Sequence, residues 1–282
     1  MQRGPGTHAF RASAVAVAAT LLVGLLPTAA SAASVTIAAG GDIARRNAPG
    51  TPQQQTAALI TDVIKPSRVL VLGDEQYEHG EYAQFLASYH PTWGAFRDIS
   101  APVPGNHEYE TANAAGYFQY FDSVLSGYGS SATDHTRGYY SFDLGDWHIV
   151  AINSNCSHVS CSAQKSWLRS DLAADDHLCE LVFYHHVKNK GLSNTVAAAG
   201  GDVILGGHKH TYERWDTSFG KDVRRFVVGT GGKSVSDPDP AADAGVRAFG
   251  VLKLVLDSSS YSWSFIDVNR KVRDSGTGTC RA

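Results

Sequence analysis

Five short polar motifs constrain this chain more than any other feature, because each of them closes an apolar run. The motifs are Gly41-Asp42, Gly73-Asp74-Glu75-Gln76-Tyr77, Gly105-Asn106-His107-Glu108, Val182-Phe183-Tyr184-His185 and Gly206-Gly207-His208-Lys209-His210. Together they offer carboxylate, amide, imidazole and phenol groups, a combination suited to hard metal ions. Four of the motifs begin with glycine, which lets the backbone turn sharply where a strand gives way to a loop. The pattern predicts a metal site built from loops at strand ends.

The spacing of the apolar residues predicts alternating strands and helices, followed by an all-β C-terminal part. A helix should begin at Thr51, with Pro52 in its first turn and Gln54 closing a capping box, and Pro66 should end it. Predicted strands cover residues 35–39, 68–72, 139–144, 147–152, 181–184, 203–205, 225–228, 250–256 and 261–268, and a second helix covers 162–172. We expect an α/β fold in which two sheets pack face to face with helices outside, forming one domain over residues 33–282.

The first 32 residues have the features of a secretory signal peptide. Arg3 and Arg11 supply a positive N-terminal region, residues 12–26 are apolar, and Ala30-Ser31-Ala32 fits a small-x-small cleavage site. The alternative is an N-terminal membrane anchor, but the apolar stretch is shorter than the ~20 residues that a spanning helix needs. We therefore expect a secreted protein with no stable membrane insertion.

The overall charge argues against a broad anion-binding surface. The formal net charge is −3, and removal of Arg3 and Arg11 with the leader would lower it to −5. Such a surface has no general attraction for nucleic acid or for an anionic membrane. An anionic small-molecule substrate would have to be attracted locally, by bound metal ions.

Four cysteines form an even set, which in an exported protein suggests two disulfides with three connectivities open. In one of them Cys156–Cys161 closes a small loop and Cys179–Cys280 fastens the C-terminus to a core strand. Free buried thiols are the alternative. Cysteine ligation of a metal is not favoured, because no Cys-x-x-Cys spacing occurs.

Taken singly, an aspartate after a strand usually belongs to a turn, and a lone histidine is more often structural than a ligand. The ordered series of Asp, Gly-Asp, Gly-Asn-His-Glu, a strand-end His and Gly-His-x-His resembles the calcineurin-like metallophosphoesterase superfamily. Most members begin with Asp-x-His, whereas Ala44 stands at that histidine position here. Tyr77 matches the Gly-Asp-x-x-Tyr motif of the purple acid phosphatase branch, and Tyr212-Glu213-Arg214 extends this match. The resemblance covers residues 35–214.

The resemblance implies a four-layer α-β-β-α sandwich with a binuclear metal centre. By this resemblance one ion would be held by Asp42, Tyr77 and His210, the other by Asn106, His185 and His208, and Asp74 would bridge them. A tyrosine has a pKa near ~10, so it binds as phenolate only to a strongly Lewis-acidic ion. Iron(III) is expected at the Tyr77 site, and a divalent ion (zinc, manganese or iron) at the other.

The implied reaction is hydrolysis of phosphate monoesters, with a metal-bound hydroxide as nucleophile. His107 should face the substrate phosphate, and a protonated imidazole there would favour an acidic pH optimum. Related acid phosphatases carry another histidine about ten residues after the His185 equivalent to protonate the leaving group, but this chain has none there. His186 is one candidate for that role, and a purely structural role for it is equally compatible with the sequence.

Two other functions fit the same residues. One is a phosphodiesterase acting on nucleotides or phospholipid head groups, and the other is a non-catalytic exported protein that binds phosphate or metal. Residues 229–234, Gly-Thr-Gly-Gly-Lys-Ser, lack the spacing of a phosphate-binding P-loop and predict a tight loop near the site.

Overall fold

The computed structural model describes residues 1, 2, 4, 6, 33–45, 50–219 and 222–281. The chain divides into two units, Met1–Ser31 and Ala32–Ala282, and every element described below belongs to the second. The predicted signal peptide falls largely outside the described residues and stays a prediction.

Two mixed sheets form the centre of the second unit. One has six strands in the order β13-β12-β11-β1-β2-β3, and the other has seven in the order β10-β8-β9-β7-β6-β5-β4. The strands are β1 (Val35–Gly40), β2 (Arg68–Val71), β3 (Ser100–Pro102), β4 (Tyr140–Leu144), β5 (Trp147–Ala151), β6 (Cys179–Phe183), β7 (Val203–Gly206), β8 (Tyr212–Trp215), β9 (Arg224–Val228), β10 (Ala244–Val246), β11 (Gly250–Leu256), β12 (Ser260–Asp267) and β13 (Val272–Thr279).

Strand β6 shows how the sheets are covered on both faces. Leu181 and Phe183 join the core cluster that lies between the two sheets, whereas Val182 joins a second cluster with Leu168 and Val196 of the helices outside. Successive side chains of a strand point to opposite faces, so a strand buried on both faces needs an uninterrupted apolar run. This explains why residues 181–184 lack a polar alternation.

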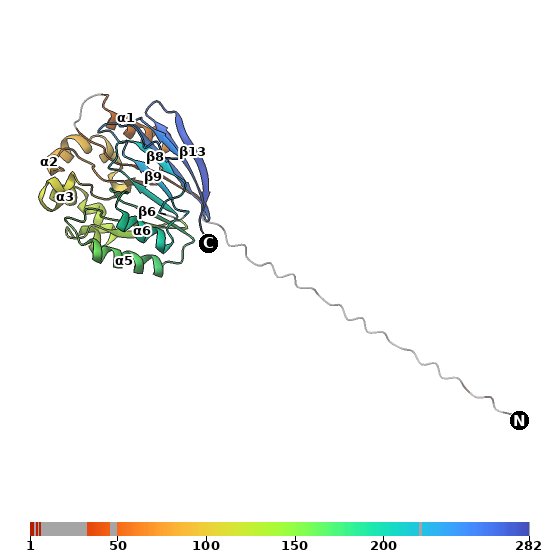
Figure 1. Ribbon diagram of the computed structural model, residues 1–282. Helices are drawn as coiled ribbons and strands as arrows, with labels where there is room; N and C mark the ends of the chain where they lie inside the picture. The colour runs from red at the N-terminus through yellow and green to blue at the C-terminus, as the bar shows by residue number, and fades with distance from the viewer. Residues whose placement is uncertain (3, 5, 7–32, 46–49, 220–221, 282) are drawn as a thin grey trace. The chain divides into compact units, whose positions relative to one another are not determined.

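Helices cover the outer faces of the sandwich (Figure 1). Helices α5 and α6 pack on the seven-stranded sheet, while the segment that begins with α1 packs on β1 and β11 of the other sheet. The α-helices are α1 (Pro52–Ala58), α2 (Tyr82–Gln84), α3 (Ala115–Leu125), α4 (Ser130–Thr133), α5 (Cys161–Ala174) and α6 (Lys190–Ala199), and π-helical segments extend α1 through Leu59–Ile64 and α2 through Phe85–Tyr89. Short 3₁₀ segments cover Trp93–Ile99, Glu108–Glu110, Ala112–Ala114 and Ser126–Tyr128. The predicted four-layer α-β-β-α arrangement is confirmed.

The first helix starts where the sequence predicted, but its capping differs. Thr51 occupies the N-cap position and Pro52 the first turn, yet the Thr51 side chain makes no capping hydrogen bond. Gln54 Oε1 instead accepts the backbone N–H of Gly50 at 2.9 Å. The predicted capping box is therefore wrong in its hydrogen bonds, although the helix boundary is right.

Two disulfides are present, Cys156–Cys161 and Cys179–Cys280. Of the three connectivities that the sequence left open, this is the one that closes a small loop and fastens the C-terminus to β6.

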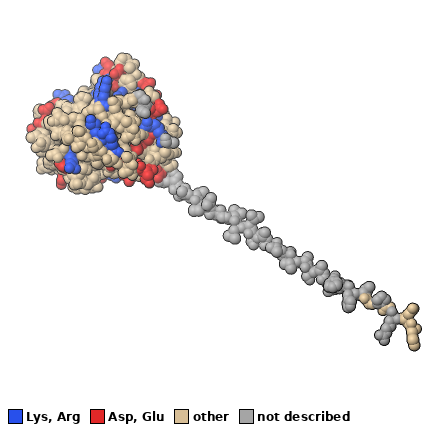
Figure 2. Space-filling model, turned by 60° about the horizontal axis from the view of Figure 1, so that its bottom comes forward, with Lys and Arg blue, Asp and Glu red and all other residues tan. Residues whose placement is uncertain are grey.

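Figure 2 shows one face of the molecule, on which lysine and arginine side chains lie in separate groups with acidic side chains near them. Within the described part of the chain, no helix combines the length and the apolar character needed to cross a membrane.

Candidate metal centre

The predicted ligands lie where the carboxyl ends of parallel strands from both sheets meet. Asp42 follows β1 and Asp74 follows β2, and these strands pair in parallel with β3 beyond them. His185 and His208 follow β6 and β7, which are parallel neighbours in the other sheet. The Gly41 N–H after β1 donates to the carbonyl of Val228 in β9 at 2.9 Å, so the two sheets are hydrogen-bonded to each other at this point. The topology therefore brings residues from distant motifs to one place.

Four of the seven predicted ligands form a first group around the Tyr77 phenol. Tyr77 Oη donates to Asp42 Oδ1 and to Asp74 Oδ2, both at 2.8 Å, and it lies 3.3 Å from His210 Nε2. His210 Nε2 is 3.1 Å from Asp42 Oδ1. The sequence prediction grouped these same residues.

The remaining predicted ligands form a second group that also shares Asp74. His185 Nε2 lies 3.2 Å from Asn106 Oδ1 and 3.3 Å from Asp74 Oδ2. His208 Nδ1 lies 3.1 Å from Asn106 Oδ1. The Nδ1–H of His185 donates to the Leu72 carbonyl at 2.9 Å, which turns its Nε2 lone pair toward Asp74 and Asn106.

The donor atoms fit two metal ions. Metal bonds of about 2.0–2.2 Å place neighbouring ligand atoms roughly 3 Å apart, and the separations within the two groups are 2.8–3.3 Å. The first group offers a phenol and two carboxylates, and the second offers imidazoles and an amide. In both groups Asp74 provides the shared carboxylate that a bridging ligand requires.

The site has a buried floor and an accessible rim. Asp42, Asp74, Tyr77 and His185 are at most 2 % exposed, whereas Asn106 and His210 are partly exposed and His208 is exposed. A ligand could therefore reach the donor atoms past the exposed side chains of Asn106, His208 and His210.

The charges of the buried residues at the site favour a bound cation. Burial and the Asp42 and Asp74 carboxylates raise the pKa of Tyr77 far above its usual value. Burial also works to raise the pKa of Asp74, but His185 and His107 together outweigh it and hold that pKa well below its usual range. Burial lowers the pKa of His185, yet Asp74 raises it to about 9. Two carboxylates that face a phenol proton would be better compensated by a metal ion in the proton's place.

Backbone conformation at the ligands is unusual. Asp42, Asp74 and His208 have backbone φ values of 58°, 52° and 67°. These lie in the left-handed region that residues other than glycine seldom occupy. Such strain persists only where the surroundings enforce it and often accompanies a functional site.

Two motif glycines are required for different reasons. Gly73 has a φ of +85°, which agrees with the predicted sharp turn. Gly105 has no positive φ, but a Cβ there would lie 2.1 Å from Asp74 Oδ1. Gly105 is needed for space beside a ligand rather than for backbone turning.

Glu108 has a role that the sequence did not reveal. Its fully buried carboxylate accepts the backbone N–H groups of Asp74 at 3.0 Å, Gln76 at 3.1 Å and Gly105 at 2.8 Å. It therefore fixes the loops after β2 and β3 against each other. The only sequence feature that pointed to Glu108 was its place at the end of the Gly-Asn-His-Glu motif.

The loop of residues 229–234 lies at the site, as predicted. Ser234 Oγ is 2.5 Å from His210 Nδ1, and the Lys233 N–H donates to the Asp42 carbonyl at 2.9 Å. Lys233 Nζ also lies 4.1 Å from the centroid of the Tyr77 ring. Ser234 and Lys233 thus support the first ligand group, a contact that sequence reasoning missed.

The two predicted catalytic histidines lie on different sides of the ligands. His107 Nδ1 donates to the Glu78 carbonyl at 2.5 Å, and its backbone N–H donates to Asp74 Oδ1 at 2.9 Å. His186 Nδ1 lies 2.9 Å from Ser154 Oγ, and its ring centroid is 4.4 Å from that of His208. Burial and the neighbouring His185 and His208 imidazoles lower the pKa of His186 to about 3.

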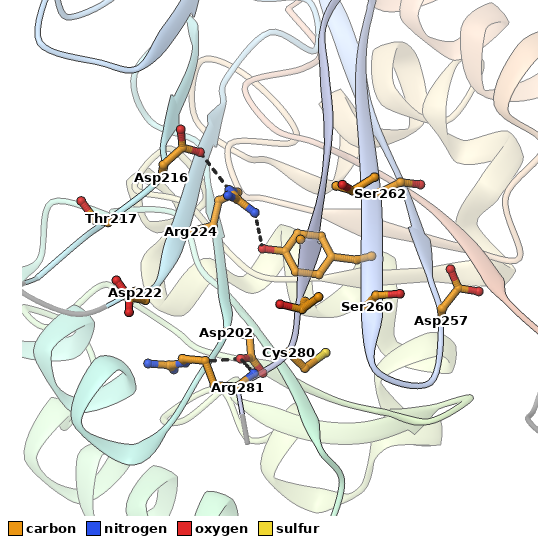
Figure 3. Close-up of a pocket in the computed structure, with 14 residues that line it drawn as sticks. Asp202, Asp216, Thr217, Asp222, Arg224, Asp257, Ser260, Ser262, Cys280 and Arg281 are labelled. Atoms are coloured by element: carbon orange, nitrogen blue, oxygen red, sulfur yellow. Dashed lines mark hydrogen bonds and ion pairs between the residues drawn. The ribbon is translucent and has the colours of Figure 1, made fainter.

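A cavity of about 810 Å³ lies away from these residues (Figure 3). Its labelled side chains include Arg224, which bridges Asp216 and the neighbouring Tyr261, and Arg281, which pairs with Asp202. None of the predicted ligands lines it. Its arginines are already paired with carboxylates, Arg224 with Asp216 and Arg281 with Asp202.

The family model described as calcineurin-like phosphoesterase matches residues 36–212, which include every predicted ligand. The chain belongs to the calcineurin-like phosphoesterase family. The predicted membership, drawn from the order of the motifs, is confirmed.

Curated relatives of this chain are purple acid phosphatases of Arabidopsis thaliana. Purple acid phosphatase 21 is 26 % identical over 223 residues, covering 64 % of this chain and 51 % of the relative. Purple acid phosphatase 18 is 26 % identical over 207 residues, covering 64 % and 44 %. The chain spans about half the length of the curated relatives it matches.

Solved structures share the fold of this chain. The purple acid phosphatase PPD1 from yellow lupin (Lupinus luteus) seeds superposes with a TM-score of 0.66 at 17 % identity, covering 88 % of this chain and 54 % of that one. GAP50, the anchor in the inner membrane complex of Plasmodium, has a TM-score of 0.62 at 12 % identity, covering 88 % and 90 %. At these identities the likeness concerns the fold alone.

Proposed function

We propose that this protein is a di-metal acid phosphatase that hydrolyses phosphate monoesters. The observation that carries the proposal is the position of the Tyr77 phenol, within 2.8–3.3 Å of Asp42, Asp74 and His210. Ala44, which stands where most family members have a histidine ligand, pairs with the same loop through the Tyr77 N–H. Tyr77 is thus the residue available to fill that place.

We assign iron(III) to the group of Asp42, Tyr77 and His210, and a divalent ion (zinc, manganese or iron) to the group of Asn106, His185 and His208, with Asp74 shared. The first group is anionic and contains a phenol that must lose its proton, which favours a trivalent ion. The second group has two neutral imidazoles and an amide. When bound, such a pair of ions activates water and compensates the negative charge of a phosphate ester during in-line displacement.

We assign His107 to contact with the substrate phosphate. Its Nδ1–H is engaged by the Glu78 carbonyl, so Nε2 is the nitrogen left to face a ligand at the rim. From this position it would stabilise charge that develops on the phosphate oxygens. As an acid phosphatase the protein should be most active below neutral pH, and a pH–rate maximum above neutral would contradict the proposal.

Of the two roles left open for His186, the geometry favours the structural one. The Ser154 hydroxyl accepts the backbone N–H of His186 at 3.0 Å and is able to donate to its Nδ1. With its pKa lowered to about 3, His186 is neutral near pH 5–7 and a poor proton donor. The reaction should then depend strongly on the leaving group, with aryl phosphates hydrolysed faster than alkyl phosphates.

We further propose that residues 1–32 are removed as a signal peptide and that the mature enzyme is secreted. The two disulfides are consistent with an oxidising compartment. The substrate would be a small phosphate ester drawn to the bound ions, since the formal net charge of the chain is negative.

The decisive test is metal analysis combined with a visible absorption spectrum of the purified protein. We expect iron, a second metal, and a tyrosinate-to-iron(III) charge-transfer band. Tyr77→Phe should remove this band, whereas Tyr140→Phe, which removes another buried hydroxyl outside the site, should keep it. An iron-free, colourless and fully active protein would overturn the metal assignment.

Relative rates on an aryl phosphate monoester and on the matching bis-aryl diester test the substrate class. The proposal expects the monoester to be hydrolysed faster. Dominance of the diester would establish the phosphodiesterase alternative, and a metal-replete protein that hydrolyses neither ester would indicate a binding protein that keeps the fold.

A further inference from the structure

A second cluster of potential metal ligands lies at the opposite end of the seven-stranded sheet. It consists of Asp143 on β4, His148 on β5, and Asp175 and His177 in the loop between α5 and β6. His148 is the second residue of β5, whereas the metal centre lies beyond the carboxyl ends of the parallel strands β6 and β7. We call these four residues the β4–β5 cluster.

The four donor atoms of the β4–β5 cluster converge. One nitrogen or oxygen from each residue lies within 4.8 Å of the other three. His148 Nδ1 is 2.8 Å from Asp143 Oδ1 and 3.6 Å from Asp175 Oδ1, and His177 Nδ1 is 2.6 Å from Asp175 Oδ1. A tetrahedral ion with bonds of about 2.0–2.1 Å needs ligand atoms roughly 3.3 Å apart. The pairs at 2.6 and 2.8 Å would move slightly apart and the wider pairs slightly together to accommodate it.

His148 is held in the orientation that a metal ligand needs. Its side chain is only 9 % exposed, and its other nitrogen, Nε2, lies 3.0 Å from Asp171 Oδ2 on α5. Asp171 is itself oriented by Ser141, whose hydroxyl donates to Oδ1 at 2.8 Å. A carboxylate that accepts the second N–H of a ligating imidazole fixes the ring and makes it a stronger ligand.

The charge of this region also lacks ordinary compensation. Asp143, Asp171 and Asp175 form ion pairs with histidines, and within the described residues no lysine or arginine pairs with them. Two neutral imidazoles would leave three carboxylates without a cation. Protonation of both His148 and His177 is one way to compensate them, and a divalent ion is the other.

We propose that the β4–β5 cluster binds one Zn²⁺ through Asp143, His148 Nδ1, Asp175 and His177 Nδ1, with Asp171 orienting His148. Two imidazoles and two carboxylates suit zinc better than calcium or magnesium, which prefer oxygen ligands alone. Asp143 is 61 % exposed and His177 is 24 % exposed, so the ion has a route of entry from solvent. Bound zinc would link the β4–β5 hairpin to the loop that leads into β6. This site is independent of the proposed phosphatase function.

The test is the zinc content of the full-length protein after equilibrium dialysis against Zn²⁺, measured by elemental analysis. Wild type should hold one more zinc ion per chain than Asp143→Ala/His177→Ala. Asp146→Ala removes a charge from the turn of the same hairpin without touching the cluster, and should match wild type. The metal centre is common to all three proteins, so its content cancels from the comparison. Equal zinc content in the double variant and wild type would overturn the proposal.

A second measurement keeps the four proposed zinc ligands and removes only Asp171, the carboxylate that orients His148. Asp171→Ala should weaken the extra zinc ion's binding by about 10–100-fold in a Zn²⁺ titration. Added Zn²⁺ should also raise the thermal midpoint of wild type more than that of Asp143→Ala/His177→Ala. Unchanged zinc affinity in Asp171→Ala together with equal thermal shifts would show that protons, rather than zinc, hold the cluster together.

Discussion

A single buried carboxylate can determine the shape of a site that it does not itself join. Glu108 accepts three backbone N–H groups from the two loops that carry Asp74 and Asn106. These loops have left-handed φ at Asp74 and a glycine pressed against its carboxylate. The strained conformation is maintained because Glu108 satisfies the amides that the turn leaves without strand partners.

Glu108→Ala should therefore destabilise the protein and disturb the site together. Three buried N–H donors would lose their acceptor, and each unsatisfied group costs about 1–3 kcal/mol. We expect the free energy of unfolding, measured in urea, to fall by about 3 kcal/mol or more, with a loss of metal content. Glu110→Ala, an exposed carboxylate two residues away, is the matched control. Equal stability of the two variants would show that solvent replaces the Glu108 contacts.

At the scale of elements, β8 and β13 show what local patterns miss. Strand β13 contains Gly276 and Gly278 and lacks an apolar alternation, so the sequence did not predict it, yet it pairs along β12. Its Asp274 accepts Tyr212 Oη at 2.6 Å and Arg214 Nε at 2.9 Å from β8, and Trp263 Nε1 at 3.0 Å from β12. Since β8 and β13 belong to different sheets, Asp274 links the two.

Asp274→Ala should weaken the contact between the sheets. It would leave a half-buried arginine without one carboxylate and two ring donors without an acceptor, for which we expect a loss of about 3 kcal/mol in the free energy of unfolding. Asp237→Ala breaks an exposed pair with Arg247 and should cost at most ~1 kcal/mol. Chemical denaturation of both variants tests this, and a smaller loss for Asp274→Ala than for Asp237→Ala would contradict it.

At the scale of the whole molecule, the two disulfides restrain very different lengths of chain. Cys156–Cys161 spans a sequence separation of 5, and Cys179–Cys280 spans 101 and joins β6 to the end of β13. The second bond therefore connects the two sheets covalently. Its cysteines are far apart in the sequence, so only the packing of the sheets decides which of the connectivities forms.

Removal of the long-range disulfide should cost more than removal of the local one. The loop-entropy model gives about 4.7 kcal/mol for a loop of about 100 residues and roughly 2 kcal/mol for the short loop. Cys179→Ala/Cys280→Ala should thus lower the unfolding midpoint further than Cys156→Ala/Cys161→Ala does. An equal effect of the two double variants would mean that strain or residual structure dominates over chain entropy.

The sequence by itself determined which residue types could serve as ligands and in which order they occur. Asp42, Asp74 and His185 each follow a strand that an apolar run predicts, and Tyr77 stands three residues after Asp74. The family was therefore predictable, and so was the gathering of these residues at one place. Apolar periodicity and motif spacing are local properties, so they can be recognised in the sequence without knowledge of the fold.

The tertiary structure decided the contacts between segments that have no local relation. Glu108 meets the Asp74 loop, Ser234 meets His210, and His177 meets Asp175 beside His148 only because two sheets and their covering helices pack in one way. Such contacts depend on which strands become neighbours, and an isolated Asp or His carries no sign of its future partner. The residues that gather at the candidate metal centre could therefore be predicted from the sequence, whereas the contacts that support them and the β4–β5 cluster could not.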